Sequence, residues 1–283
     1  SYLDYRMSEI QKRFLQEARM RRRKIAVGIV KPTDELVDRL WDAQGYADLT
    51  VVGTKLEGLN CIPTKDDEEA SRIICELAYK KEVDGFCRAQ LKDSFTHKVW
   101  REITGKGESD KKPFIFFGAK DERWFAAVSV SNYNALDLES KRYEIDEGIK
   151  FLENELDIRP KIAILSTRRL SGRVGEFGPI EEIAQRCATI DDELKKRGYE
   201  VHDEYYINYE QAIKEGCTLI CPSVGMIGNT WAKALVYTGG WENIFTPYFH
   251  EGGYYDSTPR NNTNIFWAII SCAAWVNRGR GND

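Results

Sequence analysis

Arginines stand beside hydroxyl and glycine residues in a loop at residues 167–176, which reads TRRLSGRVGE. Arg168 and Arg169 open this loop, and Gly172 and Gly175 follow. Guanidinium groups and free backbone N–H groups both bind oxyanions such as phosphate and carboxylate. We therefore expect an anion-binding loop that includes Arg168 and Arg169. A surface loop whose arginines pair with nearby acids is the alternative.

A second loop, at residues 222–230, reads PSVGMIGNT and follows a short apolar run. Gly225 and Gly228 allow the backbone to approach a ligand closely, and the Asn229 amide can both donate and accept hydrogen bonds. The spacing is neither a dinucleotide-binding fingerprint nor a Walker loop. Gly228 and Asn229 are candidate binding residues, and a purely structural turn is the alternative.

A third loop, at residues 252–262, reads GGYYDSTPRNN and leads into an apolar helix that we expect to begin near Asn264. Arg260 lies close to this helix start and beside the hydroxyl groups of Ser257 and Thr258. Such a grouping suits a carboxylate or a phosphate, and either hydroxyl could also cap the helix.

A fourth candidate is the segment DGFCRAQ at residues 84–90, from which Arg88 and Gln90 emerge between a strand and a helix expected at 92–103. His97 lies on that helix, where a histidine is more often packed or solvent-facing than catalytic. His202 and His250 likewise have no neighbouring serine or cysteine with a nucleophile signature. The sequence therefore supports no catalytic triad.

These loops need a scaffold, and the chain alternates helix-length polar stretches with short apolar runs, as in a largely parallel sheet covered by helices. The predicted strands are 25–30, 49–52, 83–87, 114–117, 124–130, 161–166, 219–221 and 244–249. Ligands of such sheets usually bind beyond the carboxyl ends of the strands, where the loops lie. We expect an α/β protein of two lobes.

Helix-start signals and periodicity indicate how the lobes divide. Thr33 and the acids at 66–69 are typical of helix starts, and an apolar periodicity predicts a helix over 137–156 that joins the lobes. The expected parts are an N-terminal helical extension at 1–23, a first lobe of 24–136 plus 256–283, and a second lobe of 137–255. Asp191 and Asp192 are expected on a solvated helix face.

Composition excludes several classes of protein. The 283 residues are 42% hydrophobic and 30% charged, which is ordinary globular usage, and the net charge of -4 does not favour nucleic acid. The basic segment 19–24 is better explained as a solvated helix end than as a phosphate or lipid patch. No apolar run reaches the length of a membrane span.

The seven cysteines are scattered and odd in number, with no secretory signal ahead of them, which favours a reducing, cytoplasmic location. Cys217 and Cys221 flank an apolar run, so we expect them to be buried rather than to bind metal, and we predict no metal site. No glycine-rich S-adenosylmethionine loop, zinc-thiol site or corrinoid motif is visible, and the cofactor is left open.

In their order along the chain, the loops resemble the methanogen marker protein 4 family. The residues that carry the resemblance are 164–166, 168–170, 225–230 and 256–260, together with 83–85 and 145–148, and it covers about 24–278. Members of that family have been proposed to be a methyltransferase subunit X, and the family is distantly similar to phosphate acetyltransferase. The resemblance implies a fold shared with phosphate acetyltransferases and isopropylmalate dehydrogenases, with the site in a cleft between two lobes.

The resemblance also assigns roles. In phosphate acetyltransferases a Ser-Arg pair before the last helix binds the acyl phosphate, and an aspartate after it is the base for the coenzyme A thiol. Arg260 matches the arginine, and Ser257 or Thr258 matches the serine if Pro259 is an insertion. Asn264 falls near the aspartate position, and an amide cannot take a proton from a thiol.

Two functions follow from these observations. The first is a cytoplasmic archaeal transferase of C1 or methanogenesis-linked metabolism that binds a small anionic substrate: phosphate, acyl phosphate or carboxylate. The second is a non-catalytic binding or accessory protein of a methyl-transfer system. A second copy of the chain and a methyltransferase subunit are both candidate protein partners, because related folds commonly dimerise.

Overall fold

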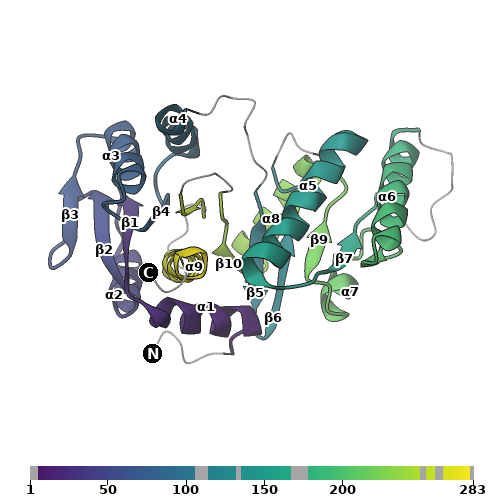
Figure 1. The fold of residues 1–283 in the computed structure, drawn as a ribbon, viewed down its shortest axis with the longest axis horizontal. Coiled ribbons are helices and arrows are strands. Elements are labelled where there is room, and N and C mark those ends of the chain that lie inside the picture. The colour runs from purple at the N-terminus through teal and green to yellow at the C-terminus, as the bar shows by residue number, and fades with distance from the viewer. Residues whose placement is uncertain are drawn as a thin grey trace. The chain divides into compact units, whose positions relative to one another are not determined.

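The computed structural model describes residues 6–105, 114–131, 135–166, 178–248, 253–258 and 264–280. The chain folds into two compact units (Figure 1). Unit 1 comprises residues 1–112 and 242–283, and unit 2 comprises residues 113–241. Both ends of the chain therefore contribute to unit 1.

The named strands of the sheet of unit 1 pair in parallel, in the order β11-β4-β1-β2-β3. Its strands are β1 (Arg23–Ile29), β2 (Ala47–Gly53), β3 (Asn60–Pro63), β4 (Gly85–Cys87) and β11 (Tyr255–Asp256). All of β1 except Lys24 is buried, as expected of a strand that is covered on both faces. β4 lies between β1 and β11, so the loop that follows β4 has a strand end on either side.

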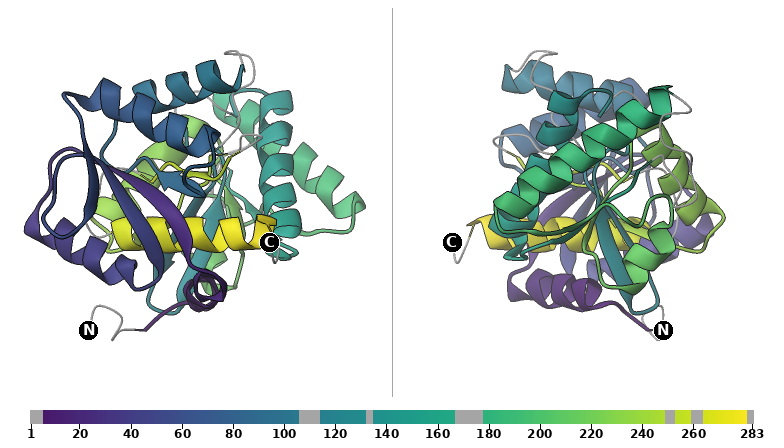
Figure 2. Two further views of the ribbon diagram at one scale, coloured as in Figure 1. Left: turned by 60° about the vertical axis from the view of Figure 1, so that its left-hand side comes forward. Right: turned by 90° about the vertical axis from the view of Figure 1, so that its right-hand side faces the viewer.

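Five helices of unit 1 are described: α1 (Glu9–Met20), α2 (Asp34–Gln44), α3 (Asp67–Tyr79), α4 (Asp93–Thr104) and α9 (Ile265–Arg280). The helix α9, yellow in Figure 2, packs against β1, β4 and α1. Every residue from Asn264 to Val276 is buried, which explains why this helix is apolar up to Val276 except at Ser271. The strand β10 (Glu242–Phe245) also packs against α9.

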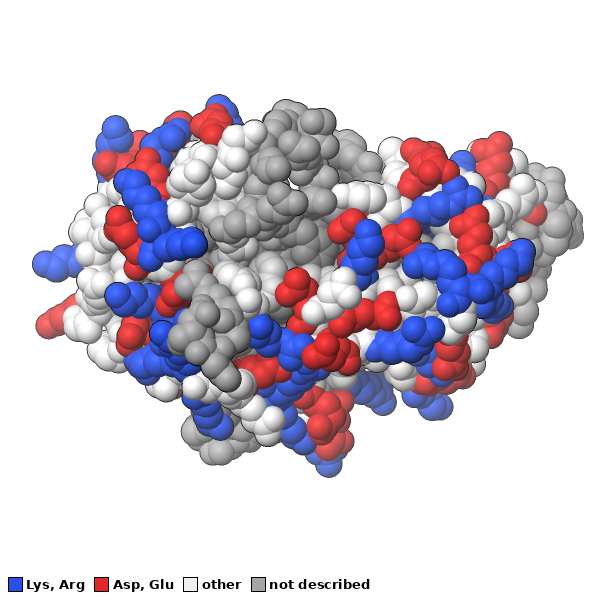
Figure 3. Space-filling model, viewed as in Figure 1, with Lys and Arg blue, Asp and Glu red and all other residues white. Residues whose placement is uncertain are grey.

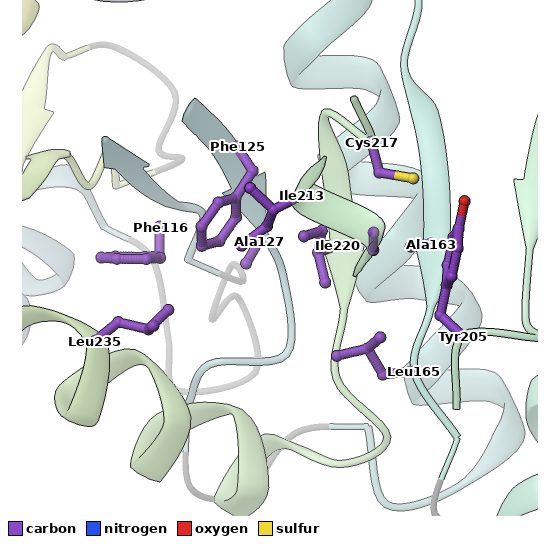
Figure 4. Close-up of a cluster of buried hydrophobic side chains, with 11 residues drawn as sticks. Phe116, Phe125, Ala127, Ala163, Leu165, Tyr205, Ile213, Cys217, Ile220 and Leu235 are labelled. Atoms are coloured by element: carbon purple, nitrogen blue, oxygen red, sulfur yellow. The ribbon is translucent and has the colours of Figure 1, made fainter. Parts of the chain in front are cut away.

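The sheet of unit 2 contains an antiparallel hairpin of β5 (Phe116–Lys120) and β6 (Arg123–Ala127). β6 pairs in parallel with β9 (Leu219–Cys221), which pairs with β7 (Lys161–Ile164), and β7 pairs with β8 (Glu200–His202). The helices are α5 (Leu138–Lys150), which continues into a π-helical turn at Phe151–Glu155, and α6 (Gly178–Lys196), α7 (Tyr209–Lys214) and α8 (Gly225–Tyr237). Phe125, Ile220 and Leu235 belong to the core beneath these helices (Figure 4).

The predicted α/β fold class is confirmed, because largely parallel strands alternate with helices that cover them. Each predicted strand overlaps an observed strand, whereas β3, β8 and β11 were not predicted. The predicted burial of Cys217 and Cys221 is also confirmed. The units begin and end at other residues than the predicted lobes, because β5 and β6 join the sheet of β9.

One prediction about the surface is wrong. Asp191 was expected on a solvated helix face, but it is buried and pairs with Lys195 at 2.7 Å, whereas Asp192 is exposed. The charged side chains on the face shown in Figure 3 are mixed in sign, with Lys and Arg interspersed among Asp and Glu. None of the described helices is both long and apolar enough to cross a bilayer.

Candidate functional site

The loop after β4 carries Arg88 and is fixed by the strands on both sides. The Arg88 N–H donates to the Asp256 carbonyl at 2.9 Å, and the Gln90 N–H donates to the Gly28 carbonyl at 3.0 Å. A third bond, from the Leu91 N–H to the Arg88 carbonyl at 3.0 Å, closes a turn. These bonds hold the backbone of Arg88 at the carboxyl end of the sheet, where α/β proteins usually bind ligands.

Gly28 permits this arrangement because the loop passes directly over it. A Cβ atom at Gly28 would lie 2.3 Å from Leu91 Cγ and 2.8 Å from the Arg88 carbonyl oxygen. Between these residues Ala89 adopts a φ of 48°, a left-handed conformation that costs a non-glycine residue about 1–2 kcal/mol. A strained backbone of this kind persists only where the surroundings fix it.

Gln90 was predicted to bind an anion, but its amide is occupied by the backbone. Its Oε1 accepts from the Val30 N–H at 2.9 Å and the Lys31 N–H at 2.8 Å, and its Nε2 donates to the Lys31 carbonyl at 2.8 Å. These bonds join the loops after β1 and β4. Gln90 therefore holds the loop that carries Arg88.

Arg88 is buried, with 7% of its surface exposed, and the acceptors that its side chain meets among the described residues are all neutral. Nε donates to Ser257 Oγ at 3.0 Å, Nη2 to the Ser257 carbonyl at 3.1 Å, and Nη1 to the Leu91 carbonyl at 2.7 Å. No carboxylate of the described residues forms an ion pair with Arg88. These bonds use three of the five N–H donors of a guanidinium. A buried charge without a counter-ion is costly, so the arrangement favours a bound anion.

Asp256 precedes Ser257 and is completely buried, but it does not form an ion pair with Arg88. Its Oδ1 accepts from the Thr258 N–H at 2.8 Å and from the Thr258 hydroxyl, and its Oδ2 accepts from the Thr246 N–H at 3.0 Å. Burial raises the pKa of Asp256 to about 6, although these hydrogen bonds and the charge of Arg88 act in the opposite direction. The Thr258 hydroxyl, predicted to bind substrate, is thus committed to Asp256.

His97 joins this group from α4, which the sequence did not indicate. Its Nε2 lies 3.1 Å from Ser257 Oγ. Its ring stacks on Tyr248, with centroids 4.7 Å apart and planes 9° apart, and meets Tyr255 edge-on at 5.6 Å. Burial, followed by the positive charge of Arg88, lowers the pKa of His97 to about 3. The imidazole is therefore neutral at pH 7.

Asn264 lies at the start of α9, where its carbonyl accepts the Ala268 N–H at 2.9 Å. Asn264 is 1% exposed, and neither atom of its amide has a hydrogen-bond partner among the described residues. A buried polar atom without a partner typically costs about 1–3 kcal/mol. Asn264 is therefore held in place by packing.

The two candidates of unit 2 lie at the start of α8. A Cβ at Gly228 would lie 1.9 Å from the Ser129 carbonyl oxygen, and Asn229 Nδ2 donates to the Val130 carbonyl at 2.9 Å. Both residues thus fasten α8 to the segment after β6. This is the structural alternative that the sequence left open, and it does not prevent the backbone of the loop from meeting a ligand.

Lys141 reaches the same loop from α5, although the sequence gave it no role. Lys141 is 1% exposed, and its ammonium donates to the carbonyls of Pro222 at 2.9 Å and Ser223 at 3.1 Å. The ammonium of Lys141 thus stabilises the turn after β9. The remaining candidates, Arg168, Arg169 and Arg260, lie outside the described residues.

No protein-family model matches the chain. It is 26% identical over 269 residues to a protein of Methanosarcina acetivorans that carries the provisional name methyltransferase mtx subunit X, and the match covers 91% of each chain. A protein of the same name from Methanosarcina mazei is 26% identical over 268 residues, again with 91% of each chain covered. The predicted resemblance is confirmed.

Solved structures agree on the fold. A branched-chain phosphotransacylase from Enterococcus faecalis matches with a TM-score of 0.61 at 12% identity, over 90% of this chain and 98% of that one. A phosphotransacetylase from Streptococcus pyogenes matches with a TM-score of 0.59 at 14% identity, over 93% and 97%. The chain thus has a phosphotransacylase-like fold and is related in sequence to proteins named for methyl transfer.

Proposed function

We propose that the chain is a transferase that binds a small oxyanion at Arg88 and Ser257. The observation that carries the proposal is the burial of Arg88 among acceptors that are all neutral in the described part of the chain. Two of its N–H donors have no acceptor among the described residues, and a phosphate or carboxylate would supply both acceptors and negative charge. The loop is already held by Gln90 and Gly28, so little conformational entropy remains to be lost on binding.

The substrate in this proposal is a phosphate, an acyl phosphate or a carboxylate of a small molecule. A fixed guanidinium can stabilise the negative charge that develops on a transferring group as well as the bound anion. Arg168, Arg169 and Arg260 are expected to add further positive charge. Gly228 and Asn229 remain candidates for a second binding loop in unit 2.

Two observations bear on the class of reaction: the fold and the names of the relatives. The phosphotransacylase-like fold favours acyl transfer to or from phosphate, and the names of the Methanosarcina relatives favour a role in methyl transfer within C1 metabolism. A non-catalytic accessory role is the second candidate, because an amide at Asn264 cannot serve as the base at the position where phosphate acetyltransferases use aspartate.

Ligand-induced thermal stabilisation of the purified protein tests the proposal, because a ligand that binds only the folded state raises the melting temperature. The panel would contain phosphate, acetyl phosphate, coenzyme A and its thioesters, S-adenosylmethionine and methylated C1 carriers. We expect stabilisation by phosphate or acetyl phosphate that is lost in Arg88→Met and in Arg260→Ala. Stabilisation only by methyl carriers would favour the accessory role.

A further inference from the structure

We propose that Ser257 is a nucleophile that takes the acyl group from a bound acyl phosphate, with His97 as its proton acceptor. This inference rests on the proposed oxyanion site at Arg88 and adds a covalent step to it. The sequence alone suggested only that Ser257 binds the anion.

The hydrogen bonds around Ser257 Oγ determine where its proton lies. Arg88 Nε can only donate, so at 3.0 Å it occupies a lone pair of Oγ. The hydroxyl hydrogen can then point at His97 Nε2, which lies 3.1 Å away and accepts it in the tautomer that carries the ring proton on Nδ1. A hydroxyl within hydrogen-bond reach of an imidazole that is itself held in place is the arrangement found in activated serine nucleophiles.

The orientation of His97 is fixed by aromatic packing. Tyr248 stacks on one face of the ring, and Tyr255 meets it edge-on. Both tyrosines are buried, so the ring has little freedom to turn away from Ser257. α4 supplies the histidine and the segment after β11 supplies the serine, so the pair is assembled entirely within unit 1.

The step balances without a further reactant. Ser257 Oγ attacks the carbonyl carbon of the acyl phosphate, an ester bond forms, and the bond between that carbon and the bridging phosphate oxygen breaks. The hydroxyl proton passes to His97 Nε2 and then to the departing phosphate. Arg88 stabilises the negative charge that develops on Oγ as the proton leaves.

Two features would otherwise oppose catalysis: the low pKa of His97 and the amide at Asn264. Burial is the largest cause of the low pKa of His97, and the charge of Arg88 is the second. A bound dianion would offset the charge of Arg88 and thereby make the imidazole a stronger base. In addition, a serine ester separates acyl capture from the later transfer. The proton acceptor for capture then comes from α4, so no base is needed at Asn264 in that step.

Acetyl phosphate is the probe for a test on the full-length protein. After incubation, the protein is digested, and the peptide with Ser257 is examined by mass spectrometry for one added acetyl group. Hydroxylamine distinguishes an ester, which it cleaves, from acetylated lysine, which it leaves intact. The variants are Ser257→Ala, His97→Gln and the control Ser94→Ala, which replaces an exposed serine of α4. Exchange of radioactive phosphate into acetyl phosphate, without another acceptor, detects an ester that turns over too fast to accumulate.

We expect a hydroxylamine-sensitive acetyl group on Ser257, or phosphate exchange, in the wild type and in Ser94→Ala. Both signals should vanish in Ser257→Ala. In His97→Gln the rates of acetylation and of phosphate exchange should fall by about 100-fold or more. His97→Gln should still be stabilised by phosphate, which separates loss of the base from loss of the fold. If phosphate binds at Arg88 but neither signal appears, the covalent step is wrong and the oxyanion site stands. If phosphate does not bind, the proposed function itself fails.

Discussion

Replacing Gly28 with alanine would press one methyl group against the loop that carries Arg88. The added Cβ would lie 2.3 Å from Leu91 Cγ, 2.5 Å from Leu91 Cδ1 and 2.8 Å from the Arg88 carbonyl oxygen. Leu91 is completely buried, and the carbonyl belongs to the backbone, so neither can move without displacing its neighbours. The conflict is relieved only if the loop lifts away from β1.

The size of the effect follows from this geometry. Overpacking of a core typically costs about 1–3 kcal/mol, and lifting the loop would also weaken the Gln90 bond to the Gly28 carbonyl, which adds about 1 kcal/mol. We therefore expect Gly28→Ala to lower the free energy of unfolding by about 2–4 kcal/mol. Displacement of Arg88 should weaken phosphate binding by about 10-fold or more, which corresponds to the loss of one hydrogen bond to a charged group.

Urea unfolding and calorimetric titration with phosphate measure the two effects. Gly105→Ala is the matched control, because a Cβ there meets nothing within 4 Å while its φ of 75° imposes backbone strain of about 1–2 kcal/mol. The control should lose stability and keep its phosphate affinity. If Gly28→Ala binds phosphate as tightly as the control, then this loop does not position the anion-binding residue, and the reasoning is wrong.

Three further predictions concern protonation and packing. The stability of the wild type relative to Asp256→Asn should improve by about 2 kcal/mol as pH falls from 7 to 4, because burial raises the pKa of Asp256 from 3.8 to about 6 and favours the protonated folded state. Chemical unfolding at several pH values checks this. NMR titration should find His97 neutral down to about pH 4, and added phosphate should raise its pKa; a free-protein pKa near the ordinary 6.5 would contradict the burial assigned to the ring. Gly228→Ala should lower the melting temperature markedly because its Cβ would collide with the Ser129 carbonyl, whereas Gly178→Ala, with nothing within 4 Å, should have little effect.

The fold could be predicted from the sequence wherever a strand is a buried apolar run. β1 and β9 are of this kind, and each was placed within two residues of its observed ends. β3 is partly exposed at the edge of its sheet, and β11 is two residues long, so neither carries an apolar signal of its own. Their strand character comes from pairing with β2 and β4.

The candidate site was predictable only where a local sequence pattern indicates the chemistry of a residue. Arg88 and Ser257 were chosen because arginines and hydroxyls at strand ends suit anions, and the structure brings these two side chains together. His97 was missed because its contact with Ser257 spans 160 residues, and no local pattern records such a contact. Gln90 and Thr258 have the right chemistry, but tertiary hydrogen bonds commit them to the backbone of Lys31 and to Asp256.

Calorimetric titration with inorganic phosphate tests the central claim most directly, with the wild type, Arg88→Met and Arg72→Met compared at one ionic strength. Arg72 also lies in unit 1, but it is on the surface of α3 beside Glu102, so its replacement removes the same charge from an exposed position. We predict that Arg88→Met weakens phosphate binding by about 10-fold or more and that Arg72→Met leaves it unchanged. Equal affinities in all three proteins would contradict an oxyanion site at Arg88.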